Sequence, residues 1–254
     1  MNLFHHKFWI CLLVGFCAQA VDGTLGMGYG LLAASSLLMF GLAPATASAS
    51  VHMAEVITTG VSAVSHHLFG NVQPELFRRL VIPGIIGAII GAYLLVWISG
   101  DVLKPWIAGY MFVMGVVVLR HAFSNSIAKP AGFGTAIGLL GFIGAMLDAI
   151  GGGGWGPIVV STLVARGNST RNTIGTANAV EFFITIASSV VFLLTLRAGL
   201  WPFVIPLSVG GFMAAPIGAW LCKRLAHRRL TGIVGAVILL NAAVALIKWF
   251  TRPS

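Results

Sequence analysis

Long apolar runs separated by short polar stretches fill this chain and predict a bundle of membrane-embedded helices. Each half contains five such runs. In the first half they span 8–22, 28–42, 48–68, 78–98 and 104–122. In the second half they span 133–148, 154–166, 174–195, 201–221 and 230–249. The last three runs of each half approach the roughly 20 residues that a helix needs to cross a bilayer.

The first two runs of each half are shorter and are separated by glycine-rich breaks. These breaks are Asp22–Gly30 and Asp148–Pro157. Because repeated glycines disfavour a continuous helix, each pair of runs predicts either a broken helix or a re-entrant hairpin. Such irregular backbone is tolerated at membrane depth only where it is buried or lines a cavity.

The chain is also duplicated. Residues 15–55 align without a gap on 141–181, at an offset of 126. The alignment pairs Asp22 with Asp148 and Glu55 with Glu181. Duplicated, glycine-interrupted apolar sequences are typical of membrane transporters with internal repeats. We therefore expect an all-α membrane protein of two repeats, 1–122 and 133–254, joined by a linker at 123–132, with eight to ten membrane segments.

Charge distinguishes inverted from parallel repeats. If each short pair returns to its starting side, three full crossings follow and the second repeat is inverted. One side of the membrane then holds ten basic residues: Arg78, Arg79, Arg120, Lys129, Arg166, Arg171, Lys223, Arg224, Arg228 and Arg229. The other side holds five: Lys7, Lys104, Arg197, Lys248 and Arg252. Parallel repeats would divide them eight to seven, so the positive-inside rule favours inversion, a cytoplasmic linker and both termini outside the cytoplasm.

Composition supports a membrane protein without a soluble domain. The chain is 58% hydrophobic and 8% charged, and its mean hydropathy is +0.97. The basic residues behind the net charge of +9 lie between apolar runs. This placement fits membrane topology and gives no reason to expect a nucleic-acid partner. Residues 5–20 are typical of a secretory signal, but residues 15–22 recur at 141–148, so we expect this segment to be retained.

The breaks are candidate anion sites. Glycine-rich turns expose backbone N–H groups, and the following helix offers its positive end. The candidate substrate-binding residues are Gly26, Gly28, Gly30, Gly152, Gly153, Gly154 and Gly156, with neutral donors from Ser50, Thr176 and Asn178. The alternative is that the glycines serve close packing and the hydroxyls bond to their own helices.

Four of the six carboxylates lie in or beside apolar runs, where ionisable groups are costly and functional by default. Glu55 and Glu181 are candidates for proton coupling or gating. Asp22 and Asp148 are also candidates for proton coupling or gating, but the sequence favours a capping role for both at the glycine-rich turns. An anion site beside these acids requires that the nearest one be protonated or hydrogen-bonded while the anion is bound.

The acid followed by a glycine-rich break, with a Gly-Thr step early in the next run, resembles the TauE/SafE sulfite exporter family. The motifs are Asp148–Pro157 and Arg171–Thr176. In the first half Leu31 stands in place of Pro157, and Ala49 and Ser50 in place of Gly175 and Thr176. The resemblance implies a secondary transporter of small sulfur-containing anions such as sulfite, thiosulfate or organosulfonates. We expect it to be a multi-pass protein of the bacterial inner membrane.

A second hypothesis is a divalent-metal permease with His52, His66, His67 and the acids as ligands. The sequence has no Walker A, Gly-x-Ser-x-Gly or His-Glu-x-x-His motif, so we expect neither ATP hydrolysis nor an enzyme activity. We also expect no cofactor and no resident metal. The expected partners are a small anionic substrate and the lipid bilayer, and no oligomeric state follows from the sequence.

Overall fold

The computed structural model describes residues 2–98, 100–123, 136–196 and 199–222 and scattered positions between 236 and 247. Within these residues every regular element is a helix, as predicted. The first half contains α1 (Asn2–Leu25), α2 (Tyr29–Met39), α3 (Pro44–Leu68), α4 (Pro74–Trp97) and α5 (Gly100–Phe123). The second contains α6 (Ala136–Gly151), the π-helical turn η1 (Gly156–Val160), α7 (Ser161–Ala165), α8 (Thr170–Thr195) and α9 (Trp201–Leu221). The predicted linker and the run at 230–249 lie largely outside the described residues.

Four of the described helices are long and apolar enough to cross a membrane: Lys7–Leu25, Pro74–Trp97, Thr170–Thr195 and Trp201–Leu221. Away from the helix ends their outward side chains are mostly apolar, as lipid contact requires; Trp97 of α4, for example, is 83% exposed. Helix α3 is 25 residues long but more polar, because its buried face carries serine, threonine, histidine and Glu55. The chain is therefore a multi-pass membrane protein whose polar groups face inward.

The structure reproduces the duplication element by element. Shifted by 126 residues, the bounds of α3 fall on those of α8 to within one residue, and α1 and α6 end at equivalent positions. The equivalent of α2 is the helical stretch formed by η1 and α7. At an offset of 127, α4 and α9 begin at equivalent residues. Over the described residues, the first four helical segments of the two halves thus follow the same series.

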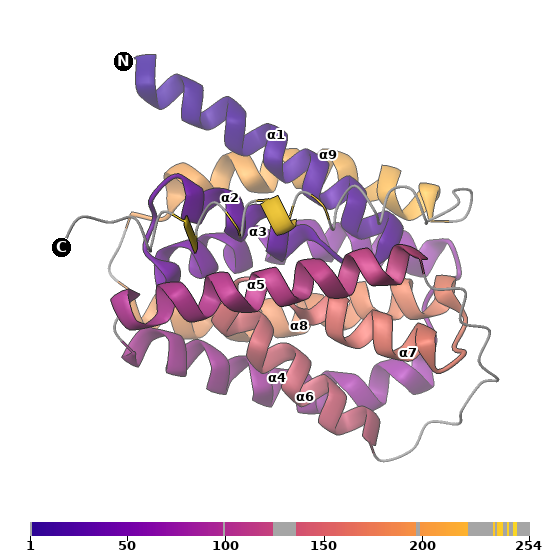
Figure 1. Cartoon of the computed structure of the whole chain (residues 1–254). Coiled ribbons are helices and arrows are strands. Elements are labelled where there is room, and N and C mark those ends of the chain that lie inside the picture. Colours follow the sequence, from indigo (N-terminus) through magenta and orange to yellow (C-terminus); the bar gives the residue numbers. More distant parts are fainter. Residues whose placement is uncertain are drawn as a thin grey trace.

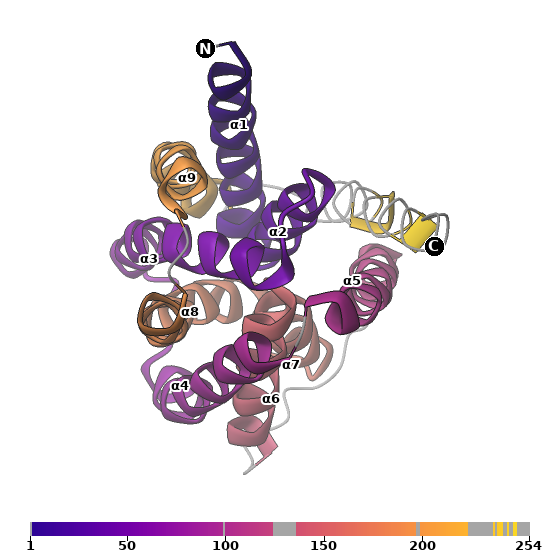
Figure 2. The same ribbon diagram turned by 90° about the vertical axis from the view of Figure 1, so that its left-hand side faces the viewer.

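The halves interlock. In Figure 1, α3 and α8 run through the middle of the bundle, and Figure 2 shows them between the pair α1 and α9 and the pair α4 and α6. The first helix of each half therefore packs on the fourth helix of the other half. In the second of these pairs, Gly87 and Gly91 of α4 lie directly against the backbone carbonyls of Phe142 and Met146. Small residues thus bring these membrane helices into close contact.

Both glycine-rich breaks are shorter than predicted, because the helix before each of them extends into the predicted break. Helix α1 has 24 residues rather than about 15, since no proline or glycine interrupts the chain between its start and Gly15. Its last turn includes Asp22, and it ends only at Gly26, whose φ is +67°. Gly152 ends α6 in the same way with φ +69°. The acids consequently lie in the final helical turns, and only a few residues on each side are irregular.

Candidate functional site at the junction of the two repeats

The two glycine-rich breaks meet in the core of the bundle. A Cβ atom on Gly30 would lie 2.6 Å from the Cα of Gly153. A Cβ on Gly153 would overlap the backbone of Gly30 and Leu31, and a Cβ on Gly156 would overlap Gly26. Because backbone fills the space above these glycines, they allow the two repeats to approach each other. This close approach is the packing role that the sequence offered as the alternative to anion binding.

The other predicted glycines surround the same junction. A Cβ on Gly152 would lie 2.7 Å from the Cβ of Ala34, and one on Gly154 would overlap the hydroxyl group of Tyr110. Gly28 precedes α2 with a φ of 126°. The chain is thus locally crowded at both breaks.

Each break is stabilised by its aspartate. Oδ1 of Asp148 accepts a hydrogen bond from the backbone N–H of Trp155 at 3.0 Å. The backbone N–H of Tyr29, the equivalent residue of the first repeat, donates to Asp22. Both aspartates are almost fully buried. They therefore cap the turn that follows α1 or α6, which satisfies an N–H group that water cannot reach.

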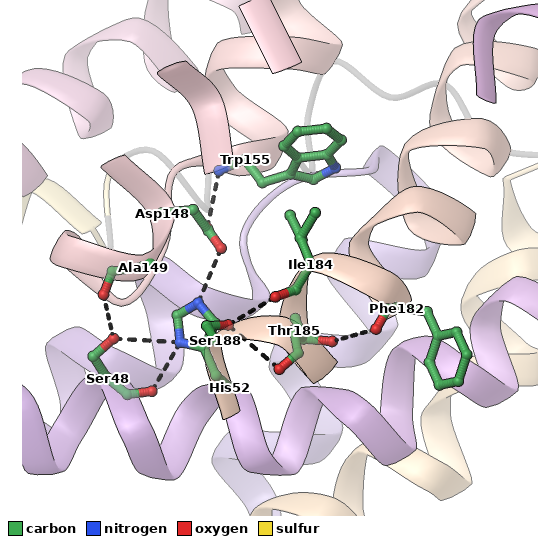
Figure 3. A network of polar contacts seen from close by, with 9 residues as sticks. All are labelled: Ser48, His52, Asp148, Ala149, Trp155, Phe182, Ile184, Thr185 and Ser188. Atoms are coloured by element: carbon green, nitrogen blue, oxygen red, sulfur yellow. Dashed lines mark hydrogen bonds and ion pairs between the residues drawn. The ribbon is translucent and has the colours of Figure 1, made fainter. Parts of the chain in front are cut away.

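Each aspartate is also contacted by the central helix of the other half, α3 or α8. Nε2 of His52, on α3, lies 3.1 Å from Oδ2 of Asp148 (Figure 3). Asn178 occupies the position equivalent to His52 on α8, and its side chain hydrogen-bonds to Asp22. The two half-sites therefore share one geometry but differ in chemistry, because histidine accepts and releases protons and asparagine does not.

Both ring nitrogens of His52 face oxygen atoms. Nδ1 lies 2.8 Å from the backbone carbonyl of Ser48, and Nε2 lies 3.1 Å from Oδ2 of Asp148. The ring is therefore held between its own helix and the end of α6.

The two glutamates lie beside this pair. An oxygen of Glu55, a ring nitrogen of His52 and an oxygen of Asp148 all lie within 4.8 Å of one another. Glu55 is 1% exposed, and neither of its carboxyl oxygens has a hydrogen-bond partner among the described residues. Glu181 is also buried and lies within electrostatic range of Asp22, Glu55 and Asp148. The structure thus gathers all four predicted acids in one buried cluster.

The predicted neutral donors are placed less uniformly. Asn178 lies in the cluster, where its Oδ1 accepts from the hydroxyl of Ser62 at 2.6 Å. Ser50 donates to the carbonyl of Thr46 in its own helix. Thr176 donates to the carbonyl of Asn172 and accepts from the backbone N–H of Gln73 at 2.8 Å. The hydroxyl groups of Ser50 and Thr176 are therefore engaged by the backbone.

The motif at 171–176 instead clamps the connection between α3 and α4. Nη2 of Arg171 donates to the carbonyl of Phe69 at 2.6 Å, and its Nε donates to Oδ1 of Asn71. The amide of Asn71 donates to His66, whose other ring nitrogen lies 3.1 Å from the carbonyl of Gly23. His66 thus belongs to this network, and His67 is exposed. Of the three histidines considered as metal ligands, only His52 lies in the acid cluster.

We expect Arg171→Gln to lower the melting temperature by about 5 °C, because it removes two hydrogen bonds from a charged donor. Arg79→Gln is the matched control, since Arg79 pairs with Glu75 on an exposed turn of α4 and such pairs contribute little. Thermal unfolding of both purified variants tests this. Equal melting temperatures would show that the clamp does not stabilise the fold.

Two features of the cluster escaped sequence reasoning. The sequence grouped His52 with His66, His67 and the acids as candidate metal ligands, but it did not indicate that His52 pairs with Asp148 of the other half. The alignment of His52 with Asn178 was a usable signal, since both positions contact the opposite aspartate. Tyr110 was missed because α5 has no aligned polar counterpart.

A helical bundle with lipid-facing apolar sides and a buried ionisable cluster between two repeats defines a polytopic membrane transporter. The sequence matches the family model "Sulfite exporter TauE/SafE" over residues 11–245. The chain therefore belongs to the TauE/SafE family, as its motifs suggested.

Two relatives come from Bacillus subtilis (strain 168). "Probable membrane transporter protein YtnM" is 42% identical over 261 residues, which cover 98% of this chain and 86% of the relative. "Probable membrane transporter protein YdhB" is 22% identical over 245 residues, which cover 93% of this chain and 97% of the relative. No solved structure matches the chain. Family and relatives thus agree on a membrane transporter.

Proposed function

We propose that this protein is a secondary transporter of a small sulfur-containing anion, such as sulfite, thiosulfate or an organosulfonate, and that a proton accompanies the anion. The family description supports the substrate class. The observation that carries the proposal is the buried cluster of Asp22, Glu55, Asp148 and Glu181 at the junction of the breaks. Ionisable groups at such a place in a membrane protein mark substrate or proton pathways.

Protonation of the cluster reconciles its acids with an anionic substrate. A protonated carboxyl group presents an O–H donor, whereas an ionised one offers acceptors only. Neither oxygen of Glu55 has a partner among the described residues, so as a neutral acid it can donate to an oxygen of the anion. Loss of its proton removes that donor and places a like charge beside the substrate. Anion binding is therefore favoured by protonation, and anion release by deprotonation.

The arrangement of the halves supports alternating access. We propose that the repeats are inverted, that the protein lies in a bacterial inner membrane, and that both termini lie outside the cytoplasm. The ten-to-five charge division supports this orientation. Helix α1 of the first half packs on α9 of the second half, and α6 of the second half packs on α4 of the first. This reciprocal packing fits two repeats that rock against each other around a fixed site.

We expect a cysteine introduced at position 2 to react with a membrane-impermeant maleimide in intact cells. The three native cysteines, Cys11, Cys17 and Cys222, are first replaced so that only the new thiol is labelled. A cysteine at position 167, in the turn between α7 and α8, is the matched cytoplasmic control. Labelling at 167 and protection at 2 would reverse the proposed orientation.

Binding of candidate substrates tests the function. Thermal shift of the purified protein with sulfite, thiosulfate and sulfoacetate, at acidic and neutral pH, is expected to show stabilisation that is larger at acidic pH. Zinc and nickel are included because His52, Glu55 and Asp148 also offer a donor set that suits a divalent metal. Stabilisation by the metals alone would favour the metal-permease hypothesis and contradict anion transport.

A further inference from the structure

Tyr110 of α5 reaches the second glycine-rich break. A Cβ atom on Gly151 would lie 2.5 Å from Cε1 of its ring, and one on Gly154 would overlap its hydroxyl oxygen. The two glycines therefore make room for this ring beside the end of α6. The phenol hydroxyl is inaccessible to solvent and has no hydrogen-bond partner among the described residues.

An unpartnered hydroxyl at this place is unusual, because buried polar groups in proteins nearly always have a partner. Asp148 lies within electrostatic range of Tyr110, but its oxygens are already engaged by His52 and by the backbone N–H of Trp155. Glu55, which lies within 4.8 Å of this aspartate, is another buried group of the cluster without a partner among the described residues, as is Oδ2 of Asp22. Two unpartnered groups converge on Asp148, one from α5 and one from α3.

We propose that Tyr110 contacts the substrate directly, by donating its O–H to an oxygen of the anion. This inference rests on the proposed function and adds a specificity-determining residue to it. A sulfur oxyanion carries several acceptor oxygens on one centre, so one oxygen accepts from the phenol while another accepts from protonated Glu55. The ring also closes the side of the break that faces α5, so the substrate is held against the second break.

The first break lacks an equivalent of this phenol. At offsets of 126 and 127, Tyr110 corresponds to Ala236 and Val237, neither of which has a hydrogen-bonding side chain. The site is therefore one-sided, and the anion is seated nearer Asp148 than Asp22. This agrees with the departures of the first repeat from the family motif at Leu31 and Ser50.

Tyr110→Phe tests the proposal, since it removes only the hydroxyl group. We expect the dissociation constants for thiosulfate and sulfite, measured by calorimetry on the purified full chain, to rise about 10- to 100-fold, the range for losing a hydrogen bond to a charged group. The KM for uptake into proteoliposomes should rise in parallel. The melting temperature without ligand should stay the same or increase slightly, because an unpartnered buried hydroxyl is removed.

Tyr93→Phe is the matched control. Tyr93 lies on α4 and is 43% exposed, so the same hydroxyl group is removed at the surface of the bundle. Its loss should leave both the melting temperature and the anion affinity unchanged.

The outcomes separate the two levels of the account. If the wild-type protein binds the anions and the Tyr110→Phe variant binds them with equal affinity, the role of Tyr110 is overturned and the proposed function stands. A variant whose affinity and melting temperature fall together would show a structural role, which also overturns it. Wild-type protein that binds neither anion would overturn the proposed function and this inference with it.

Discussion

Glu55→Gln is expected to leave the protein folded and able to bind its anion, and to reduce the pH dependence of transport. The amide has nearly the same shape as the protonated acid and keeps a donor, but it does not exchange a proton. Within the part of the chain that the structure describes, neither oxygen of Glu55 has a hydrogen-bond partner, so the substitution breaks no hydrogen bond seen there. The same reasoning applies to Glu181→Gln.

The sign of the effect follows from linkage between the proton and the anion. In the wild-type protein, low pH populates the protonated cluster, and anion affinity is highest there. As pH rises and the cluster loses a proton, affinity should fall by up to about tenfold per pH unit for one linked proton. Glu55→Gln should flatten this slope, and the double variant with Glu181→Gln should show no residual slope.

Glu75→Gln is the control for this experiment, because Glu75 is exposed and pairs with Arg79 one turn along α4. Its replacement should leave both the slope and the rate unchanged. Uptake into proteoliposomes at several pH values, with the membrane potential clamped, gives the slope for each variant. If the wild-type slope persists in all three glutamine variants of the cluster, the acids do not couple a proton and the membrane potential becomes the driving force.

The second large effect concerns folding. Gly153→Ala should destabilise the protein by more than about 3 kcal/mol, because even a methyl group at this position overlaps the backbone of Gly30 and Leu31. Backbone moves aside far less readily than a flexible side chain. The outcome should be little or no monodisperse protein after extraction from the membrane, since the contact between the two repeats is lost.

Gly109→Ala is the matched substitution at an open position. Gly109 lies within α5, and a Cβ there would meet no atom within 4 Å. In a helix this change stabilises by up to about 1 kcal/mol, so we expect normal yield and a normal melting temperature. Size-exclusion profiles and thermal unfolding of the two variants provide the comparison. A Gly153→Ala protein as stable as the Gly109→Ala protein would show that the breaks are not in close contact.

The sequence predicted those features of the site that depend on equivalence between the repeats. An offset of 126 identified Asp22 with Asp148 and Glu55 with Glu181, and all four acids lie in one cluster. The glycine-rich breaks were also located to within a few residues. Periodic apolar runs and conspicuous glycines carry this information locally, so no knowledge of tertiary contacts was needed.

The contacts between side chains of the two repeats could not be predicted from the sequence. Alignment shows that His52 and Asn178 are equivalent, but not that each contacts the aspartate of the other half. Thr176 was a reasonable donor by position, yet its hydroxyl accepts from Gln73 in a connection that only the folded chain brings near. Tyr110 depends on the packing of α5 against Gly154, and apolar helices give little indication of which face packs where.

Proton-linked anion flux through the wild-type protein tests the central claim most directly. Purified protein is reconstituted in liposomes, the membrane potential is held at zero, and uptake of labelled sulfite or thiosulfate is followed with and without an inward proton gradient. Labelled zinc is run in parallel. The account predicts that the gradient accelerates uptake of the anion and drives its accumulation, with no zinc flux. Anion uptake that ignores the gradient, or zinc uptake without anion uptake, would contradict it.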